Sequence, residues 1–273
     1  MTIEKLIETG AVKQFGGGVI DVTTDTSLPL VALNVAKLQV EVVTPQPVRL
    51  VLAYTESCQA AVEISVAEGC SVEIVDVYFA DSYVNVTLNQ ASGSQCKTLS
   101  ALLSSSNVTY TCNLNGQNAT NVFDGLFIAH GSDHATLSLT TRHLVSDCRS
   151  NSLIKGISSD RATGEFRGLV YVAQDAQRTD AQQQNRNIEL DNSHIVALPQ
   201  LEIYADDVRC SHGSTVGYSN PEAIFYMRQR GISEADARRM QIEGFVQDVV
   251  SRCNMEPVCA VVHQAVTDKL SNI

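Results

Sequence analysis

Residues 62–74 read VEISVAEGCSVEI and pass twice through an apolar–polar alternation, with a turn between the two halves. In the first half, Val62, Ile64 and Val66 share one face of an extended chain. The dipeptide Glu68-Gly69 supplies turn residues, and the second alternation follows directly. The stretch therefore predicts two short β-strands joined by a tight turn, each with one face in a core.

The same pattern of short alternating strands and turns continues to about residue 217. Further predicted strands are Val84–Leu88, Ala135–Thr140, Gly168–Val172 and Leu201–Tyr204, separated by turns rich in Gly, Asn, Ser or Asp. Aromatic residues make up 5% of the chain and Trp is absent, so the core must be narrow. A coiled, stacked sheet suits such a core better than a sandwich does, although the strands repeat at no fixed period. The pattern favours a mainly β fold of the β-helix type.

From about residue 220 the pattern becomes helical. Asn220-Pro221 predicts an N-cap followed by a first helical residue, and Gly231 predicts the end of that helix. Ser233 predicts a second start, in a variant of the capping box that uses Asp236, and Glu256-Pro257 predicts a third. Three helices are therefore expected at the C-terminal end.

These patterns divide the chain into two predicted domains. A β-helix core is expected over residues 1–217, with a short helical lead-in near residues 3–13. A small α-helical domain is expected over residues 218–273, about the smallest size that folds alone, so it should pack on the sheet or on a partner.

Charge and hydropathy restrict the classes of function. The 273 residues carry a formal net charge of −11, which repels phosphate backbones and anionic lipid, so binding to nucleic acid or to membranes is not expected. No segment approaches the roughly 20 apolar residues that a spanning helix needs, and the first residues lack the apolar stretch of an export signal. The sequence therefore predicts a cytoplasmic location.

The chain contains eight cysteines, none of them in a C-x-x-C pair. In a long chain without an export signal, an even number of cysteines does not imply a disulfide framework. We expect reduced thiols, most of them buried as small apolar residues.

Motifs of several enzyme classes are absent. The sequence has no G-x-x-x-x-G-K-[ST], no G-x-S-x-G and no H-E-x-x-H. A β-helix enzyme that cleaves polysaccharides would need acids gathered in a groove. The aspartates that could serve are scattered along the sequence: Asp25, Asp76, Asp81, Asp124 and Asp133.

Two histidines four residues apart, His130 and His134, have the spacing of metal ligands on a helix. Gly131 and the strand-like residues that follow predict a turn instead. The sequence therefore favours ordinary turn histidines at this place over a metal site.

A second candidate site is the sequence Cys210-Ser211-His212. In an extended strand, residues two apart point the same way, so the thiol and the imidazole would project from one face. Both are ligands for iron or zinc, but a closed metal site usually needs four ligands and nothing nearby supplies the others. From the residues alone, two interpretations stay open: a structural Cys beside an exposed His, or half of a site that another chain completes across a strand edge.

The run from Pro199 to Gly217, PQLEIYADDVRCSHGSTVG, resembles the signature of the SufB/SufD family of the Suf iron–sulfur cluster assembly system, most closely its SufD branch. The resemblance continues through Ala223–Ile232 and Ala237–Met240. It extends backward through Gly164–Gly168 and Gln182–Asn187. The matching motifs are specific from about residue 160 to 250, whereas before residue 160 only the general strand-and-turn pattern of the sequence matches.

The resemblance implies a right-handed parallel β-helix followed by a small C-terminal α-helical domain. It also implies a non-catalytic scaffold subunit, on which cluster building is coupled to the SufC ATPase. His212 then matches a proposed ligand of iron or of a cluster at the SufB interface, and Cys210 lies beside it. The isolated chain would hold no tightly bound cofactor, and iron or a cluster would bind transiently in the complex.

Partners follow from the same resemblance. Pairing with SufB would use the terminal strands of the β-helix, and SufC would bind the C-terminal helices. Candidate anchors for SufC are Phe225, Tyr226, Met240 and Phe245, each of which could instead fill the core of the helical domain.

Two alternatives stay open: a β-helix enzyme acting on a polysaccharide, and a SufB-like subunit that works as a homodimer. The chain also departs from many family members, which carry a longer N-terminal helical segment. Any function tied to that segment is in doubt here.

Overall fold

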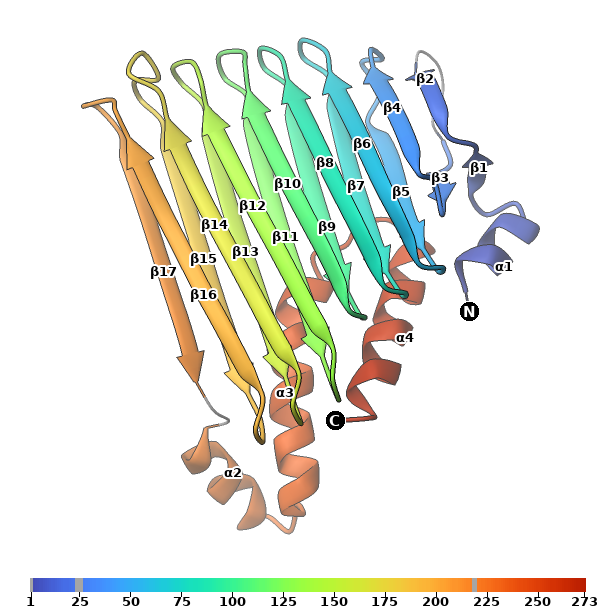
Figure 1. The fold of residues 1–273 in the computed structure, drawn as a ribbon, viewed down its shortest axis with the longest axis vertical. Coiled ribbons are helices and arrows are strands. Elements are labelled where there is room, and N and C mark those ends of the chain that lie inside the picture. Colours follow the sequence, from blue (N-terminus) through green and yellow to red (C-terminus); the bar gives the residue numbers. More distant parts are fainter. Residues whose placement is uncertain (1, 23–26, 218–219) are drawn as a thin grey trace.

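In the computed structural model, the chain forms a parallel β-helix followed by helices that lie along one of its faces (Figure 1). The structure describes residues 2–22, 27–217 and 220–273. The predicted fold class, a mainly β parallel β-helix with C-terminal helices, is confirmed. Among the described residues, no helix has the length and apolarity needed to cross a membrane.

Two all-parallel sheets make up the β-helix, and successive strands alternate between them. The first sheet, in spatial order, contains β1 (Lys13–Phe15), β3 (Leu30–Leu33), β5 (Val48–Tyr54), β7 (Ser71–Tyr78), β9 (Gln95–Leu102), β11 (Thr120–Ala129), β13 (Arg149–Ser158), β15 (Asp180–Glu189) and β17 (Arg209–Gly217). The second sheet contains β2 (Gly18–Val22), β4 (Lys37–Val42), β6 (Cys58–Val66), β8 (Ser82–Gln90), β10 (Ser106–Leu114), β12 (His134–His143), β14 (Thr163–Val172) and β16 (His194–Ile203). Each strand predicted from the sequence lies within one of these strands or overlaps it.

The interval between paired strands lengthens along the chain, which explains why the sequence shows no fixed period. In the N-terminal half, Cys58 pairs with Ser82, 24 residues further on. In the C-terminal half, Arg149 pairs with Asp180, 31 residues further on. The strands lengthen as well, so later turns of the β-helix are wider than earlier ones.

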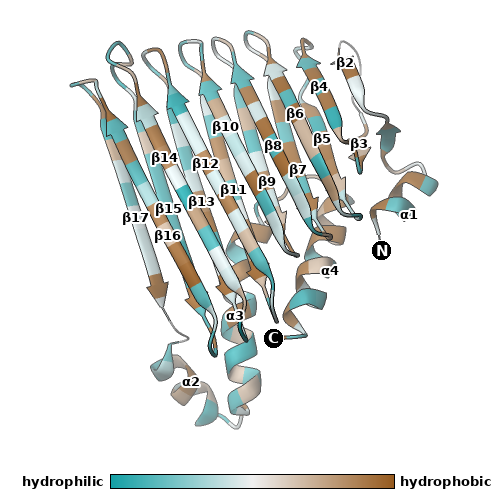
Figure 2. Ribbon diagram, viewed as in Figure 1, coloured by the Kyte–Doolittle hydropathy of each residue, from teal (hydrophilic) through white to brown (hydrophobic). Residues whose placement is uncertain are grey.

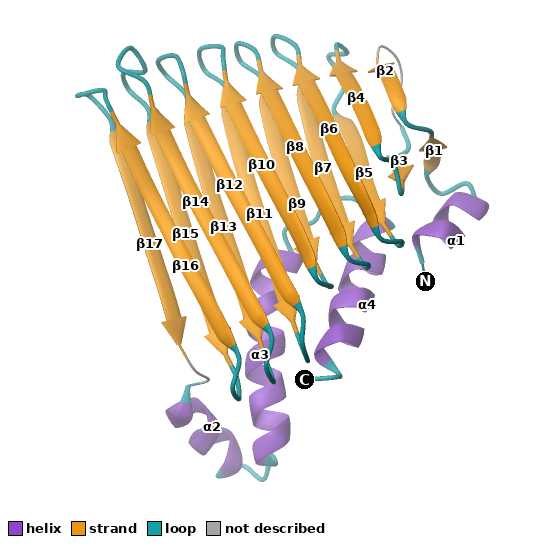
Figure 3. Ribbon diagram, in the orientation of Figure 1, coloured by secondary structure: helices purple, strands orange, loops and turns teal. Residues whose placement is uncertain are grey.

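The two sheets differ in how they are buried. In β8, as in most strands of the second sheet, every second residue is buried, because one face meets the inner core and the other meets solvent. In the first sheet, β5, β7, β9, β11 and β13 contain runs of consecutive buried residues and are therefore buried on both faces over much of their length, whereas β15 alternates and β17 is largely exposed. Figure 3 shows why: helices cover the outer face of this sheet. In Figure 2 the strands accordingly mix hydrophilic and hydrophobic residues along their length.

Apolar side chains form two main cores. The inner core fills the space between the sheets and includes Leu50, Ile64 and Val86. The outer core joins the outer face of the first sheet to the helices, and includes Val75 from a strand and Val262 from a helix. Burying a Val or Leu side chain contributes about 1.5–3 kcal/mol, so the outer core fixes the helices firmly to the sheet.

The helices begin where the sequence predicts. They are α1 (Ile3–Glu8), α2 (Pro221–Arg228), α3 (Glu234–Val250) and α4 (Val258–Leu270). The Asn220 side chain accepts hydrogen bonds from two backbone N–H groups at the start of α2, and the Ser233 side chain accepts one from Asp236 at the start of α3. These caps satisfy backbone donors that would otherwise lack partners.

The N-terminal helix is shorter than the lead-in expected near residues 3–13. It ends at Glu8, the chain turns through Gly10 at φ 71°, and β1 begins at Lys13. At the other end, the expected boundary at residues 217 and 218 adjoins residues 218–219, which lie outside the described residues. The division into two domains stays a prediction.

Two ion pairs in the described part of the chain join the C-terminal helical segment to the first sheet. Lys155 on β13 is 4% exposed, donates to the backbone oxygen of Phe245 at 2.8 Å and pairs with Asp248 at 2.9 Å. Arg252, just after α3, pairs with the buried Asp124 of β11 at 3.1 Å. Burial raises the pKa of Asp124, and the Arg252 guanidinium offsets part of that rise.

The cysteines are not all reduced. Cys253 and Cys259 form a disulfide between the end of α3 and the start of α4. The expectation of free thiols holds for the other six and is wrong for this pair. The two residues are six apart in sequence, and only the turn between the helices brings them together.

Candidate functional site

The last turn of the β-helix consists of β16 and β17, each at the edge of its sheet. β17 pairs with β15 on one side, and β16 pairs with β14. No other strand of the described chain covers their outer edges. The terminal turn therefore presents two rows of backbone hydrogen-bonding groups that another chain could pair with.

Cys210 and His212 both lie on β17, as the sequence predicts. By register, Cys210 is level with Ala181 and His212 with Gln183 on the neighbouring strand. Both Ala181 and Gln183 are buried inside the β-helix. Cys210 and His212 therefore share the face that continues the interior, at a level where no further turn covers them.

The two side chains differ in exposure. Cys210 is half-buried and packs against a small apolar cluster, which consists of Val170, Val172, Ala176, Ala181 and Ala205. Burial raises the pKa of its thiol, and the negative charge of Asp180 adds to that rise. A metal that binds Cys210 must therefore displace a proton. His212 is exposed at the open end.

Within the described residues, no group of three or more His, Cys, Asp or Glu side chains is placed to hold a metal ion. Both interpretations of Cys210 and His212, as structural residues or as two ligands of a shared site, therefore stay open. An open depression of about 310 Å³ runs along β15 and β17 and is lined in part by His212, Gly213 and Gln184. In a shared site, the remaining ligands would have to come from another chain.

One residue of this region was not singled out from the sequence. Gln183 points into the β-helix directly below His212 and is 1% exposed, yet neither its Nε2 nor its Oε1 has a hydrogen-bond partner among the described residues. The signal was available in the run Asp180–Glu189, where Gln183 and two asparagines occupy inward positions that other strands fill with Val, Ile or Leu.

Three of the four candidate anchors on the helices are exposed. Phe225 and Tyr226 on α2 are 63% and 57% exposed, and Met240 on α3 is 48% exposed. The guanidinium of Arg230 lies 4.5 Å from the centre of the Tyr226 ring. Phe245 differs, because it is half-buried against the outer core.

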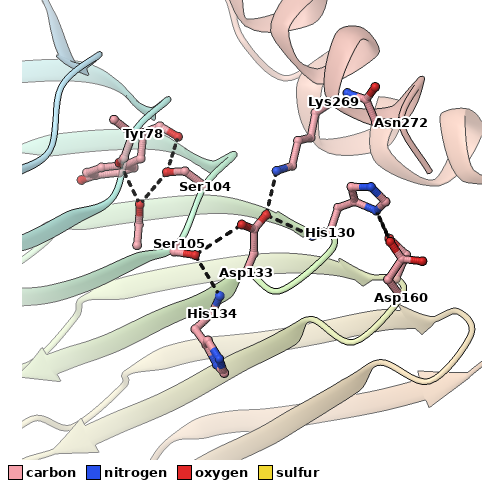
Figure 4. Close-up of polar contacts among 12 residues, drawn as sticks. Tyr78, Ser104, Ser105, His130, Asp133, His134, Asp160, Lys269 and Asn272 are labelled. Carbon is pink, nitrogen blue, oxygen red and sulfur yellow. Dashed lines mark hydrogen bonds and ion pairs between the residues drawn. The ribbon is translucent and has the colours of Figure 1, made fainter.

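The two histidines four residues apart flank a turn and do not lie on a helix, since His130 precedes the turn and His134 is the first residue of β12. The Asp133 N–H donates to the His130 backbone oxygen at 3.2 Å, and the Asp133 carboxylate pairs with Lys269 of α4 at 2.7 Å. His130 turns toward Asp160, whereas His134 points away from it (Figure 4). The interpretation as turn histidines is the one that this geometry supports, and the turn ties α4 to the β-helix.

The scattered aspartates do not gather in a groove. Asp76 lies inside the β-helix, Asp124 under the helices, and Asp133 in the turn just described. Asp81 is exposed between β7 and β8. Asp25 lies outside the described residues. The described members of this set therefore offer no carboxylate pair for glycoside cleavage.

Comparison with known proteins identifies the family of the chain. Residues 33–245 match the family described as SUF system FeS cluster assembly, SufBD core domain. The iron–sulfur cluster assembly protein SufD of Escherichia coli is 41% identical over 137 residues, an alignment that covers 50% of this chain and 32% of that protein. A SufBD family protein of Synechocystis is 36% identical over 135 residues, covering 49% and 29%.

A third relative is SufD of Bacillus subtilis, 30% identical over 151 residues, with 52% of this chain and 35% of that protein covered. The alignments thus span about a third of the length of these curated relatives. The family match nevertheless extends from β3 across the terminal turn and into α3. The chain belongs to the SufBD family of the SUF iron–sulfur cluster assembly system.

Proposed function

We propose that this chain is a non-catalytic scaffold subunit on which an iron–sulfur cluster is built at an interface with a second β-helix subunit. The observation that carries the proposal is the position of His212, exposed on the interior-facing side of the last, uncovered strand. An imidazole in that place can bind iron only if another chain closes the site. Iron or the cluster is cargo in this proposal, held transiently by His212 with Cys210 beside it.

The second subunit that we propose is SufB, paired through the edges of β16 and β17. Apolar side chains lie exposed around these edges, with Ile203 38%, Tyr204 59% and Val216 44% exposed. Ile203 and Val216 face the interior side of their strands, so a covering chain would bury them as the next layer of the core. Edge pairing supplies backbone hydrogen bonds, and these side chains supply apolar contact.

The SufC ATPase is the third component, which we place at α2 and α3. Phe225, Tyr226 and Met240 support this placement because they are exposed aromatic or flexible apolar side chains of the kind enriched at protein interfaces. Phe245, also predicted as an anchor, supports this placement less, because it already contacts the outer core. A cytoplasmic location likewise stays a prediction.

Co-expression with SufB and SufC tests the proposal. With the tag on SufC, we expect this chain and SufB to co-purify in one complex that contains iron and acid-labile sulfide. His212→Ala should leave the chain folded, because the side chain is exposed in the isolated chain, and should leave the complex intact, because the edges of β16 and β17 supply the pairing; it should remove most of the iron and sulfide. His134→Ala, which alters an exposed histidine on the second sheet, is the matched control and should change neither quantity.

The other outcomes separate the alternatives. A homodimer of this chain that carries a cluster without SufB would favour the SufB-like alternative. A complex whose iron and sulfide content is the same in His212→Ala and in the unaltered chain would show that His212 is not a ligand. Failure to associate with either partner would refute the scaffold proposal itself.

A further inference from the structure

The interior of the β-helix becomes polar toward its open end. In the N-terminal turns, inward positions hold apolar residues such as Leu50 and Ile74. On β15 the inward positions from 183 onward hold Gln183, Asn185 and Asn187, all between 1% and 3% exposed. Burying amides in place of apolar side chains costs stability unless each amide finds hydrogen bonds.

The two asparagines do find them. Asn185 donates to the backbone oxygen of Ile154 at 3.3 Å and accepts from Asn187 at 2.6 Å, and the Ser214 hydroxyl donates to it at 3.2 Å. Gln183 is different, because both of its amide atoms are buried and unpaired among the described residues. Leaving a buried polar group unpaired costs about 1–3 kcal/mol.

Gly168, on the opposite sheet, leaves room for the side-chain amide of Gln183. A Cβ atom at Gly168, on β14 of the opposite sheet, would lie 2.5 Å from Gln183 Nε2. The glutamine side chain therefore crosses the interior to reach the second sheet, and only glycine at position 168 leaves space for it. Directly above it in register lies His212, on the last strand.

We propose that Gln183 is a positioning residue for His212. When a second chain covers the terminal turn, the imidazole is held over the open interior, and Gln183 Oε1 accepts a hydrogen bond from its Nδ1–H. This bond fixes one tautomer and leaves the Nε2 lone pair free for iron, as partners of metal-binding histidines commonly do. The inference rests on the proposed function, because it assigns a role at the same site.

Gln183→Met tests it, since methionine has nearly the same length and no hydrogen-bonding group. A positioning role predicts that the variant is as stable to urea as the unaltered chain, or more stable, because an unpaired amide has been removed. It also predicts that the His212-dependent affinity of the co-purified complex for ferrous iron alone, measured under anaerobic conditions, falls by about tenfold or more. Gln183→Glu keeps an acceptor at the same place and should restore binding.

A spectroscopic readout makes the test independent of cluster yield. With isotopically labelled histidine, the nitrogen spectrum of the complex should show one tautomer of His212 in the unaltered chain and a mixture in Gln183→Met. Ser152→Ala, one strand below Gln183 in the same interior column, is the control and should leave the tautomer unchanged.

The outcomes distinguish this inference from the proposed function. If His212→Ala removes iron binding and Gln183→Met does not, the positioning role is wrong and the scaffold proposal stands. If Gln183→Met lowers stability together with iron binding, Gln183 is a structural residue and the inference fails. If His212→Ala has no effect on iron, His212 is not a ligand and the positioning role of Gln183 is wrong as well, whereas the scaffold proposal depends on the association with SufB and SufC.

Discussion

At the scale of single residues, the buried carboxyl group of Asp76 should make stability depend on pH. It lies inside the β-helix, where the hydroxyls of Tyr78 and Tyr110 donate hydrogen bonds to it. Burial raises its pKa from 3.8 to about 6, against the smaller opposing effect of these and other hydrogen bonds. Because the folded-state pKa is raised, the contribution to stability is full below pH 3.8 and is lost as pH rises through about 6. The difference between the two values corresponds to roughly 3 kcal/mol.

Asp76→Asn removes the ionisation and keeps a carbonyl that can accept from both hydroxyls. We expect the variant to be more stable than the unaltered chain above pH 6, by up to roughly 3 kcal/mol, and the advantage to shrink toward pH 3.8. Urea unfolding midpoints across this range measure it. Asp81→Asn removes an exposed charge and is the control; a gain for Asp76→Asn that is the same at every pH would contradict the account.

The positions of some of these residues could be predicted from the sequence. Extending the alternation of Val72 and Ile74 by two residues places Asp76 on the inward face, so its position was predictable. Gln183 could have been found in the same way. Its lack of a hydrogen-bond partner could not, because that depends on Gly168 in the opposite sheet, which no local pattern connects to it.

At the scale of elements, one of the contacts that attach the C-terminal helices to the first sheet is an ion pair between a buried carboxylate and a partly exposed arginine. Asp124 is 2% exposed, and Arg252 contacts it from the turn after α3. Arg252→Ala would leave the buried carboxylate without its nearest cation; because the Arg252 side chain is 41% exposed, we expect a cost of about 1–3 kcal/mol, below that of a fully buried pair. We therefore expect a clear fall in the urea midpoint and a further rise in the pKa of Asp124.

A matched control is available on α3 itself. Arg238 pairs with Glu234 at 2.8 Å, but both side chains are about half exposed. Pairs of this kind contribute roughly 0.5 kcal/mol at most. If Arg238→Ala and Arg252→Ala lower stability equally, burial of Asp124 is not what makes the second pair important.

Helix starts were predictable because capping is local: Asn220 and Ser233 act within three residues of their own positions. The buried stripe of α3 was less predictable. Met240 fits a helical period with Ala237, yet Met240 is exposed while Ile242 and Val246 are buried, because the sheet beneath the helix decides which face is covered. The sequence did not predict the disulfide either, because its two cysteines meet only through the turn between α3 and α4.

At the scale of the whole molecule, β16 and β17 form the last turn of the β-helix, and no further strand of the described chain covers the end of its inner core. If a second β-helix continues it, charge placed among the interior-facing apolar residues should prevent association. We expect Val216→Asp to reduce co-purification with SufB strongly while leaving the unfolding midpoint nearly unchanged, because the side chain is 44% exposed in the isolated chain. Val19→Asp is the control, since Val19 is 70% exposed on β2 at the opposite end. Equal loss of SufB in both variants would argue against the terminal turn as the interface.

The number of turns and their widening could not be predicted from pattern, because strand pairing joins residues 17 to 31 apart and the interval itself changes. The sequence could identify Cys210 and His212 as neighbours on one strand face. The predicted end of the β region near residue 217 already favours a strand edge here, but only the structure shows that β17 pairs with β15 on one side, which is the observation behind our proposal of a shared site.

The most direct test of that claim is pulsed electron paramagnetic resonance on the reduced cluster of the co-purified complex. This chain alone should carry isotopically labelled histidine. The account predicts a histidine nitrogen coupling to the cluster that is present in the unaltered chain, present in His134→Ala and absent in His212→Ala. A cluster that shows no coupling to this chain's histidine, or one whose coupling survives His212→Ala, would contradict it.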